Sequence, residues 1–376
     1  MIIAAKSLCR QGEKVASCRW AYLIGFPILI RPPFQILKSV WSRLADGSWG
    51  ITDLNGLTLK PIAGYSETFF KLDWEVNLLT TRPSNNPYEL FSSFGSTEFL
   101  LRQSILPVVS WRHGDEVIRC VGTASVISCT GYLLTAAHVL MDPFEQKNGV
   151  IKKEGKTTFC DDFEFGVLIP YQREGSRGIL VCPFEKLWIW GHWEQSPLLN
   201  QNDRFNYTTD IAVCKIPPLP LNAAYQPFAM SLNAFVKDEA AYAIGYAEMD
   251  DIPISYKNGQ LVIAEFNAHL FVSIGEVMQV FSDNHLLRDV PTPGPCFDFC
   301  ARIPGKMSGA PIFGARGAVI RGVVSRSFSG ESHAYGAMLG PGMNMPLDEP
   351  NLPSKSLYSL MIEGNEGIAQ LIGEGL

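Results

Sequence analysis

Three short segments of the chain hold residue types that together can carry out nucleophilic catalysis. His138 follows an apolar stretch and two small residues, Asp210 opens a predicted buried strand, and Ser308 precedes a glycine on a predicted tight turn. A serine hydroxyl is a poor nucleophile at neutral pH until an imidazole takes its proton, and a buried carboxylate fixes the tautomer of that imidazole. The set therefore predicts an acyl-transfer site with Ser308 as nucleophile, His138 as base and Asp210 as the residue that orients the base.

Each of these residues has a simpler interpretation when it is taken alone. His138 would be a structural histidine, Asp210 an ordinary carboxylate at a strand start, and Ser308 one of many turn serines. Their joint occurrence favours catalysis, and so does their order of His, Asp, Ser. The α/β-hydrolases have the order Ser, Asp, His and need a G-x-S-x-G turn, which is not found here.

The same segments resemble the trypsin-like (chymotrypsin-fold) serine peptidases, and their pattern is closest to bacterial, disulfide-free members. Residues 135–138 are similar to the histidine motif, 210–212 to the aspartate motif, and 308–311 to the serine motif, with Ala in place of its second Gly. Residues 322–325 resemble the strand whose serine, here Ser325, supports the catalytic Asp. The resemblance implies a serine endopeptidase that acts on protein or peptide substrates and needs no metal or organic cofactor.

The loop before the nucleophile departs from the family pattern. The family places Gly two residues before the catalytic Ser, where its N–H helps to bind the oxyanion, but Lys306 stands there. Either Lys306 or, if one residue is inserted, Gly305 would donate beside the Ser308 N–H. We expect this oxyanion hole to be malformed or mobile at rest and to form when substrate or an activating partner protein binds. The alternative is an inactive relative that serves as an interaction module.

Two arginines are expected near the substrate. Arg302, six residues before Ser308, falls where the resemblance puts the floor of the specificity pocket, and Ser325 and Arg326 would line the cleft wall. Two arginines there would favour acidic or small substrate side chains. Arg302 would otherwise point to solvent or to Asp298, and an inserted residue would shift this register.

The elements that position these residues are predicted to be strands. From about residue 100, short β-rich runs follow one another, and a Pro-rich turn at 217–220 divides them into two groups. The predicted fold is mainly β, with two antiparallel six-stranded β-barrels of the chymotrypsin type. The predicted domains are an N-terminal extension of unknown role over 1–95, a first barrel over 100–225 with His138 and Asp210, a second barrel over 235–345 with Ser308, and a C-terminal helical tail over 350–376.

Outside the barrels, periodicity predicts three elements. Apolar residues at helical spacing between Ile36 and Leu44 predict a short helix, and alternation from Phe70 to Leu78 predicts a strand. Near the C-terminus, Leu357, Leu360 and Met361 predict a helix with Ser354 as its cap.

Composition excludes some functions. The 31 Lys and Arg against 37 Asp and Glu give a net charge of -6, so no overall positive field favours nucleic acid or an anionic membrane. The longest apolar run, 20–30, contains Pro27 and is shorter than the roughly 20 residues that a membrane span needs. No membrane span is predicted, although this run leaves a secretory signal open.

The cysteine pattern favours free thiols. Nine Cys are an odd number and form no C-x-x-C pair, which suits a reducing compartment and predicts a cytoplasmic protein, with secretion as the alternative. Cys296 and Cys300 lack a second ligand pair, so no metal site is predicted.

Overall fold

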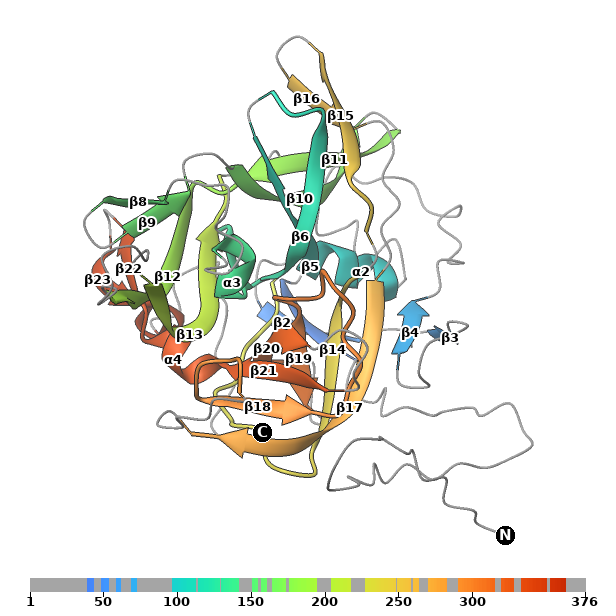
Figure 1. The fold of residues 1–376 in the computed structure, drawn as a ribbon. Coiled ribbons are helices and arrows are strands. Elements are labelled where there is room, and N and C mark those ends of the chain that lie inside the picture. Colours follow the sequence, from blue (N-terminus) through green and yellow to red (C-terminus); the bar gives the residue numbers. More distant parts are fainter. Residues whose placement is uncertain are drawn as a thin grey trace, which may run out of the picture.

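The computed structural model describes residues 97–362 with gaps, and four short strands before them (Figure 1). The gaps are 113, 129, 142–150, 155–156, 161–163, 174–175, 195–203, 218–226, 248, 258–259, 264–269, 283–289, 315–318, 328–332 and 350–351. The early strands are β1 (Ser39–Arg43), β2 (Trp49–Asp53), β3 (Leu59–Pro61) and β4 (Phe69–Leu72). Among all the residues that the structure describes, no helix is both long and apolar enough to span a bilayer.

The first sheet carries the segments of His138 and Asp210. Its main path runs β11-β10-β5-β6-β7-β13-β12 with antiparallel neighbours. The strands are β5 (Ile105–Trp111), β6 (Val117–Val126), β7 (Tyr132–Thr135), β10 (Glu164–Arg173), β11 (Ser176–Pro183), β12 (Lys186–Glu194) and β13 (Arg204–Lys215). Every residue of β5 and β7 is buried, so these central strands form the core of this half.

The second sheet carries the segments of Ser308 and Ser325 and closes on itself. Its path β14-β19-β20-β21-β18-β17 returns to β14 through an additional β14–β17 pairing. The strands are β14 (Ala240–Tyr246), β17 (Leu270–Phe281), β18 (Cys296–Phe299), β19 (Pro311–Gly314), β20 (Ile320–Ser327) and β21 (Ala334–Met338). A second buried cluster that includes Phe297, Phe299 and Met307 fills this barrel. The prediction of a mainly β fold is confirmed, and a closed six-stranded barrel beside a second antiparallel sheet is consistent with the predicted chymotrypsin-like double barrel.

The first sheet differs from a closed six-stranded barrel. Among the described residues its outer strands β11 and β12 do not pair with each other. The register explains this: β10 pairs with β5 only over 164–167, but with β11 over 166–173. The hairpin of β10 and β11 therefore continues past the edge of β5, and the first half is an open half-barrel.

Residues between the two sheets hold them together. The Phe228 N–H donates to the Val126 carbonyl of the first sheet at 2.8 Å, and the Ser231 N–H donates to the Ile320 carbonyl of the second at 2.9 Å. The Phe228 ring packs edge-on against Phe313 with centroids 5.2 Å apart. A further hairpin, β15 (Ile252–Lys257) with β16 (Gln260–Ile263), follows β14 but pairs with β6 of the first sheet.

Two expectations for the N-terminal part meet described residues. The helix predicted between Ile36 and Leu44 is wrong, because 39–43 form β1 and pair with β2. Two helical turns of apolar residues fit a strand equally well, and pairing with a second segment decides between them. The strand predicted from Phe70 begins as β4, whereas 73–78 lie outside the described residues. β4 pairs with β17, so part of the extension adds to the second sheet.

The C-terminal region begins with strands. Helix α4 (Leu339–Met343) leads into β22 (Pro346–Glu349), β23 (Leu352–Ser356) and α5 (Leu357–Ile362). The predicted cap at Ser354 is wrong, because pairing of β23 with β22 keeps that residue in a strand. The Ser356 hydroxyl instead accepts the Ser359 N–H at 3.2 Å, which caps the first turn of α5. The rest of the predicted tail, 363–376, lies outside the described residues.

Candidate active site

His138 lies on a single helical turn at the end of β7. Ala136 continues the extended backbone with φ -82° and ψ 141°, and α3 (Ala137–Leu140) begins directly after it. Ala136 and Ala137 are completely buried, so only small side chains fit beside the imidazole. The side chain of His138 is 12% exposed, so a small part of it remains accessible.

Asp210 reaches His138 from the neighbouring strand. In the β13–β7 pair, Ala212 lies opposite Thr135, which carries Asp210 past the end of β7 toward α3. The sequence pattern predicts that Asp210 opens this strand. That prediction is wrong, because β13 begins six residues earlier at Arg204. The register between β12 and β13 shifts near this point, as in a β-bulge, which turns local side chains out of the regular pleat.

The Asp210 carboxylate is buried and fully engaged. Its Oδ1 accepts the His138 backbone N–H at 2.9 Å, and its Oδ2 is 2.8 Å from His138 Nδ1. The Ser325 hydroxyl donates to the same Oδ2. Burial alone would raise the pKa of Asp210, but the charge of His138 and the hydrogen bonds from His138 and Ser325 outweigh it and hold the pKa below its usual value. An ionised Asp210 can accept but not donate, so His138 carries its proton on Nδ1.

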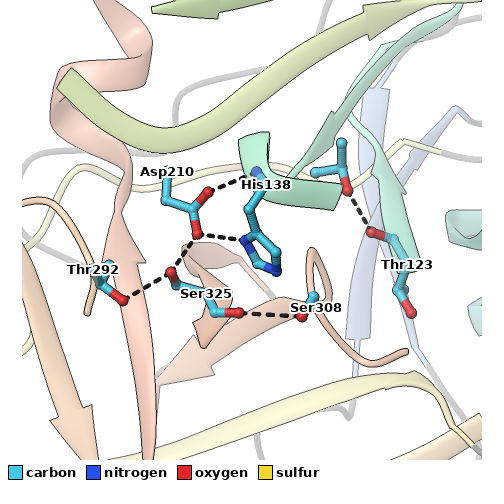
Figure 2. A network of polar contacts seen from close by, with 7 residues as sticks. Thr123, His138, Asp210, Thr292, Ser308 and Ser325 are labelled. Atoms are coloured by element: carbon cyan, nitrogen blue, oxygen red, sulfur yellow. Dashed lines mark hydrogen bonds and ion pairs between the residues drawn. The ribbon is translucent and has the colours of Figure 1, made fainter. Parts of the chain in front are cut away.

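Figure 2 shows this network continuing beyond Ser325. The hydroxyls of Ser325 and Thr292 are 2.9 Å apart. Both residues are buried, with 0% and 2% of their surface exposed. Sequence reasoning finds Ser325 through the resemblance but misses Thr292, because no motif marks a lone threonine before β18.

Ser308 sits on a loop that packs on the first sheet. Gly309 has φ +85°, and a Cβ there would lie 2.1 Å from the Thr123 carbonyl, so only glycine fits after the serine. The Ser308 carbonyl accepts the Thr123 N–H at 2.8 Å, and the Gly309 N–H donates to the Val324 carbonyl at 2.8 Å. Thr123, from β6, is a second residue of the site that sequence reasoning misses.

The Ser308 hydroxyl donates to the main-chain carbonyl of Ser325 at 3.2 Å. In the view of Figure 2 the imidazole of His138 lies between Asp210 and the Ser308 loop, with no hydrogen bond drawn to the Ser308 hydroxyl. The structure thus gathers His138, Asp210, Ser308 and Ser325, with the serine hydroxyl turned toward a carbonyl.

Lys306 adopts the conformation that a glycine would adopt more readily. Its φ is +74°, whereas Gly305 is absent from the left-handed residues of the described chain. The Lys306 carbonyl accepts the Thr123 hydroxyl at 3.1 Å, and its ammonium donates to the Met249 carbonyl. Within the described part of the chain, the N–H groups of Lys306 and Ser308 donate to no backbone carbonyl. Neither N–H group is therefore committed to the described main chain.

The two arginines lie on adjoining segments. The Arg302 carbonyl accepts the Ser273 hydroxyl at 2.6 Å, and the Ser327 hydroxyl donates to the Ile303 carbonyl at 2.8 Å. The second bond ties the segment before Ser308 to the strand end that holds Arg326. Both arginines are partly exposed.

Asp298, named as an alternative partner of Arg302, has a different neighbour. Its carboxylate lies 3.8 Å from Nδ1 of His333. Burial raises the pKa of Asp298, and the nearby His333 offsets part of this effect.

The described cysteines form no disulfide. They are Cys120, Cys182, Cys214, Cys296 and Cys300, of which all but Cys300 are buried. Burial raises the pKa of the Cys120 thiol to about 12, which keeps it protonated and unreactive at neutral pH. No group of three or more His, Cys, Asp or Glu side chains suited to a metal ion occurs among the residues that the structure describes.

Comparison with known proteins gives structural matches only. No protein-family model and no curated protein matches the chain. Deg5 is similar with a TM-score of 0.37 and 15% identity over 65% of this chain and 87% of that chain. The HtrA-type protease AlgW with a decapeptide has a TM-score of 0.34 and 15% identity over 63% and 61%. An inactive form of Rv3671c from M. tuberculosis has a TM-score of 0.32 and 14% identity over 63% and 82%. These similarities are too low to assign an activity.

Proposed function

We propose that the protein is a serine endopeptidase with His138, Asp210 and Ser308 as its catalytic residues. The observation that carries the proposal is the bond from His138 Nδ1 to the buried Asp210 carboxylate, 2.8 Å long, beside the loop of Ser308. This bond orients the imidazole, and in the neutral form of the ring it places the free lone pair on Nε2, which can then act as a base. Nucleophilic catalysis needs these features, and a purely structural histidine does not.

The reaction then follows from the positions of the groups. Ser308 Oγ forms a bond to the carbonyl carbon of the scissile peptide while its proton passes to Nε2 of His138. His138 returns that proton to the leaving amine as the C–N bond breaks, and water hydrolyses the resulting ester by the same path. Asp210 stays ionised throughout and stabilises the imidazolium.

The oxyanion would be bound by two main-chain donors, the N–H groups of Ser308 and Lys306. Lys306 is a better candidate than Gly305, because it has a left-handed φ of +74° and is closer in sequence to Ser308. Backbone donors of this kind are worth about 10²- to 10³-fold in rate when one is lost.

The resting site would be gated. The Ser308 hydroxyl is bonded to the Ser325 carbonyl, so it must rotate toward His138 before it can react. Binding of a peptide, or of an activating partner protein, would supply the energy for this rotation and for ordering the oxyanion loop. The substrate would carry an acidic or small side chain next to the scissile bond, facing Arg302 and Arg326.

A fluorophosphonate probe tests the proposal directly. Only an activated serine reacts with it, and peptide mapping by mass spectrometry identifies the modified residue. We expect labelling at Ser308 that is lost in Ser308→Ala and His138→Ala. Ser359→Ala, which removes a hydroxyl on α5 distant in sequence from the site, serves as the matched control and should label normally.

The competing function is a catalytically inactive interaction module. It predicts no probe labelling in the wild-type protein, even after addition of peptides. It also predicts that peptides bind equally well to wild-type protein and to Ser308→Ala.

A further inference from the structure

A chain of buried hydroxyl groups continues from Asp210 into the second barrel. The Ser325 hydroxyl contacts Asp210 Oδ2, and the Thr292 hydroxyl lies 2.9 Å from that of Ser325. Asp210 and Thr292 are each 2% exposed, and Ser325 is 0% exposed. Water cannot readily replace any of these partners, so each hydrogen bond must be satisfied within the chain.

The direction of each hydrogen bond follows from the protons available. An ionised Asp210 only accepts, so the single proton of the Ser325 hydroxyl is directed to it. The Ser325 oxygen then has only lone pairs to offer Thr292. Thr292 must therefore be the donor, and the chain runs from Thr292 through Ser325 to Asp210.

This order gives Thr292 a specific task. By occupying a lone pair of Ser325, it prevents the Ser325 hydroxyl from turning away from Asp210. A hydroxyl that accepts a hydrogen bond is also a stronger donor, and such cooperation is largest where water is excluded. Loss of the Thr292 hydroxyl would leave a buried acceptor without a donor and would loosen the Ser325 bond to Asp210.

The segment that holds Thr292 is itself anchored. The Thr292 carbonyl accepts the Cys296 thiol at 3.5 Å, and the Pro295 carbonyl accepts the Met338 N–H at 3.1 Å. These bonds tie the segment to β18 and β21 of the second barrel. Thr292 therefore joins the barrel of Ser308 to the Asp210 of the other half.

We propose that Thr292 is a positioning residue that acts through Ser325 to hold the Asp210 carboxylate in its hydrogen bond with the His138 imidazole. The proposal rests on the proposed peptidase function for its rate effects, but its geometric part does not. Thr292 touches neither the substrate nor the reacting atoms.

The kinetic test compares Thr292→Val with Thr292→Ser in the full-length protein. Thr292→Val removes the hydroxyl, and we expect kcat, or the rate of fluorophosphonate labelling of Ser308, to fall about fivefold with KM unchanged. Thr292→Ser keeps the hydroxyl and should restore the wild-type rate. Thr130→Val is the control, because it removes the exposed member of another hydroxyl pair, that of Ser128 and Thr130 at 2.9 Å.

A double-mutant cycle shows whether Thr292 acts through Ser325. In a Ser325→Ala background, Thr292→Val should cause no further loss, because the intermediate hydroxyl is already absent. Additive losses would overturn the proposal, and so would a Thr292→Val protein with the wild-type rate. If Thr292→Val does not fold, Thr292→Ala and Thr292→Ser form a second pair that differs by the hydroxyl alone.

A spectroscopic measurement separates this proposal from the peptidase assignment. The proton between His138 Nδ1 and Asp210 should give a far-downfield resonance in protein labelled with ¹⁵N-histidine. We expect this resonance to shift or broaden in Thr292→Val and to stay in place in Thr292→Ser and Thr130→Val. Failure of the fluorophosphonate probe to modify Ser308 would refute the peptidase function. An unchanged resonance in Thr292→Val would refute the role of Thr292.

Discussion

Ser325 binds both Asp210 and Ser308 in this protein. Its hydroxyl donates to the Asp210 carboxylate, and its main-chain carbonyl accepts the hydroxyl of Ser308 at 3.2 Å. In the proposed mechanism, the residue that supports the Asp210 carboxylate would thus also engage the hydroxyl of the nucleophile. A substrate that pairs with the strand end at Ser325 would compete for that carbonyl and release the hydroxyl.

The buried Asp210 should make stability depend on acid. Its pKa in the folded protein is lowered from the ordinary aspartate value of 3.8, so its contribution is fully present above that pH. The contribution is lost as the pH falls through the lower, folded-state pKa. We expect the free energy of unfolding in urea to drop less steeply below about pH 4 in Asp210→Asn than in wild type. Parallel curves for the two proteins would show that this carboxylate is not selectively stabilised.

Sequence could predict the His138, Asp210 and Ser308 segments because each motif is local. The small residues before His138 and the glycine after Ser308 are required by close packing, and they are adjacent in sequence to His138 and Ser308. Thr292 has no such signal, because it meets Ser325 only after β18 and β20 have assembled. The bond from Lys306 to Met249 likewise depends on a contact between residues 57 positions apart.

Lys306 provides a test of the oxyanion loop. A non-glycine residue at φ +74° is strained by about 1 kcal/mol, and the ammonium bond to Met249 offsets this strain. Lys306→Met keeps the strain and loses the bond, so we expect the loop to relax and kcat to fall by up to about 10²-fold. Lys306→Gly removes the strain and should equal or exceed the resting activity of the wild type.

Peptide hydrolysis and probe labelling, measured for both variants, check this prediction. Higher resting activity in Lys306→Gly would support a gated hole. Equal impairment in Lys306→Gly and Lys306→Met would show that the ammonium, and not the backbone conformation at residue 306, is what the site needs.

The cysteines should react according to burial. Burial raises the pKa of Cys120, Cys182 and Cys296 to about 12 each, and Cys300 is the only partly exposed thiol among the described cysteines. Among these described cysteines, we expect iodoacetamide to modify Cys300 fastest in the folded protein. In guanidinium without reductant all nine cysteines of the chain should react. Two or more intact disulfides in the mass spectrum would contradict the free-thiol prediction.

The strands were easier to predict than their closure. Alternating and continuous apolar runs mark most strands of the two sheets, such as β5, β7 and β14, because burial acts residue by residue, but they do not mark β12, β18 or β21. Whether β11 meets β12 depends on register and hairpin length, which leave no comparable pattern. The same limit applies to β1, where apolar spacing over a few residues fits a helix and only the partner strand β2 decides.

Gly309 should be the least replaceable residue of the loop. A Cβ there would lie 2.1 Å from the Thr123 carbonyl and 2.2 Å from Thr135 Oγ1, and φ is +85°. We expect Gly309→Ala to destabilise the protein by about 2–4 kcal/mol in urea unfolding and to abolish labelling of Ser308. Gly305→Ala is the control for stability, because nothing lies within 4 Å of its Cβ. Comparable stabilities of the two variants would mean that the loop can move away from β6.

Arg302 and Arg326 should determine which peptides are cut. The bond from Ser327 to the Ile303 carbonyl holds their segments side by side, and both arginines are partly exposed. A charged hydrogen bond to an acidic substrate side chain is worth about 1.5–3 kcal/mol. We therefore expect Arg302→Ala to lower kcat/KM by about 10- to 100-fold for a peptide with Glu before the scissile bond. The same variant should change little for a peptide with Ala there.

The comparison of the two peptides separates recognition from folding. If Arg302 has only a structural role, its loss would disturb the Ser308 loop. Activity would then fall equally on both peptides, whatever side chain the substrate carries. Arg326→Ala should also weaken the preference for the Glu peptide over the Ala peptide. Because Arg302 remains in that variant, part of the preference should persist. Arg119→Ala, which removes an exposed side chain of β6 that pairs with Asp115, is the matched control and should leave the ratio of the two kcat/KM values unchanged. A Glu-to-Ala ratio that no arginine variant alters would place substrate selection elsewhere in the cleft.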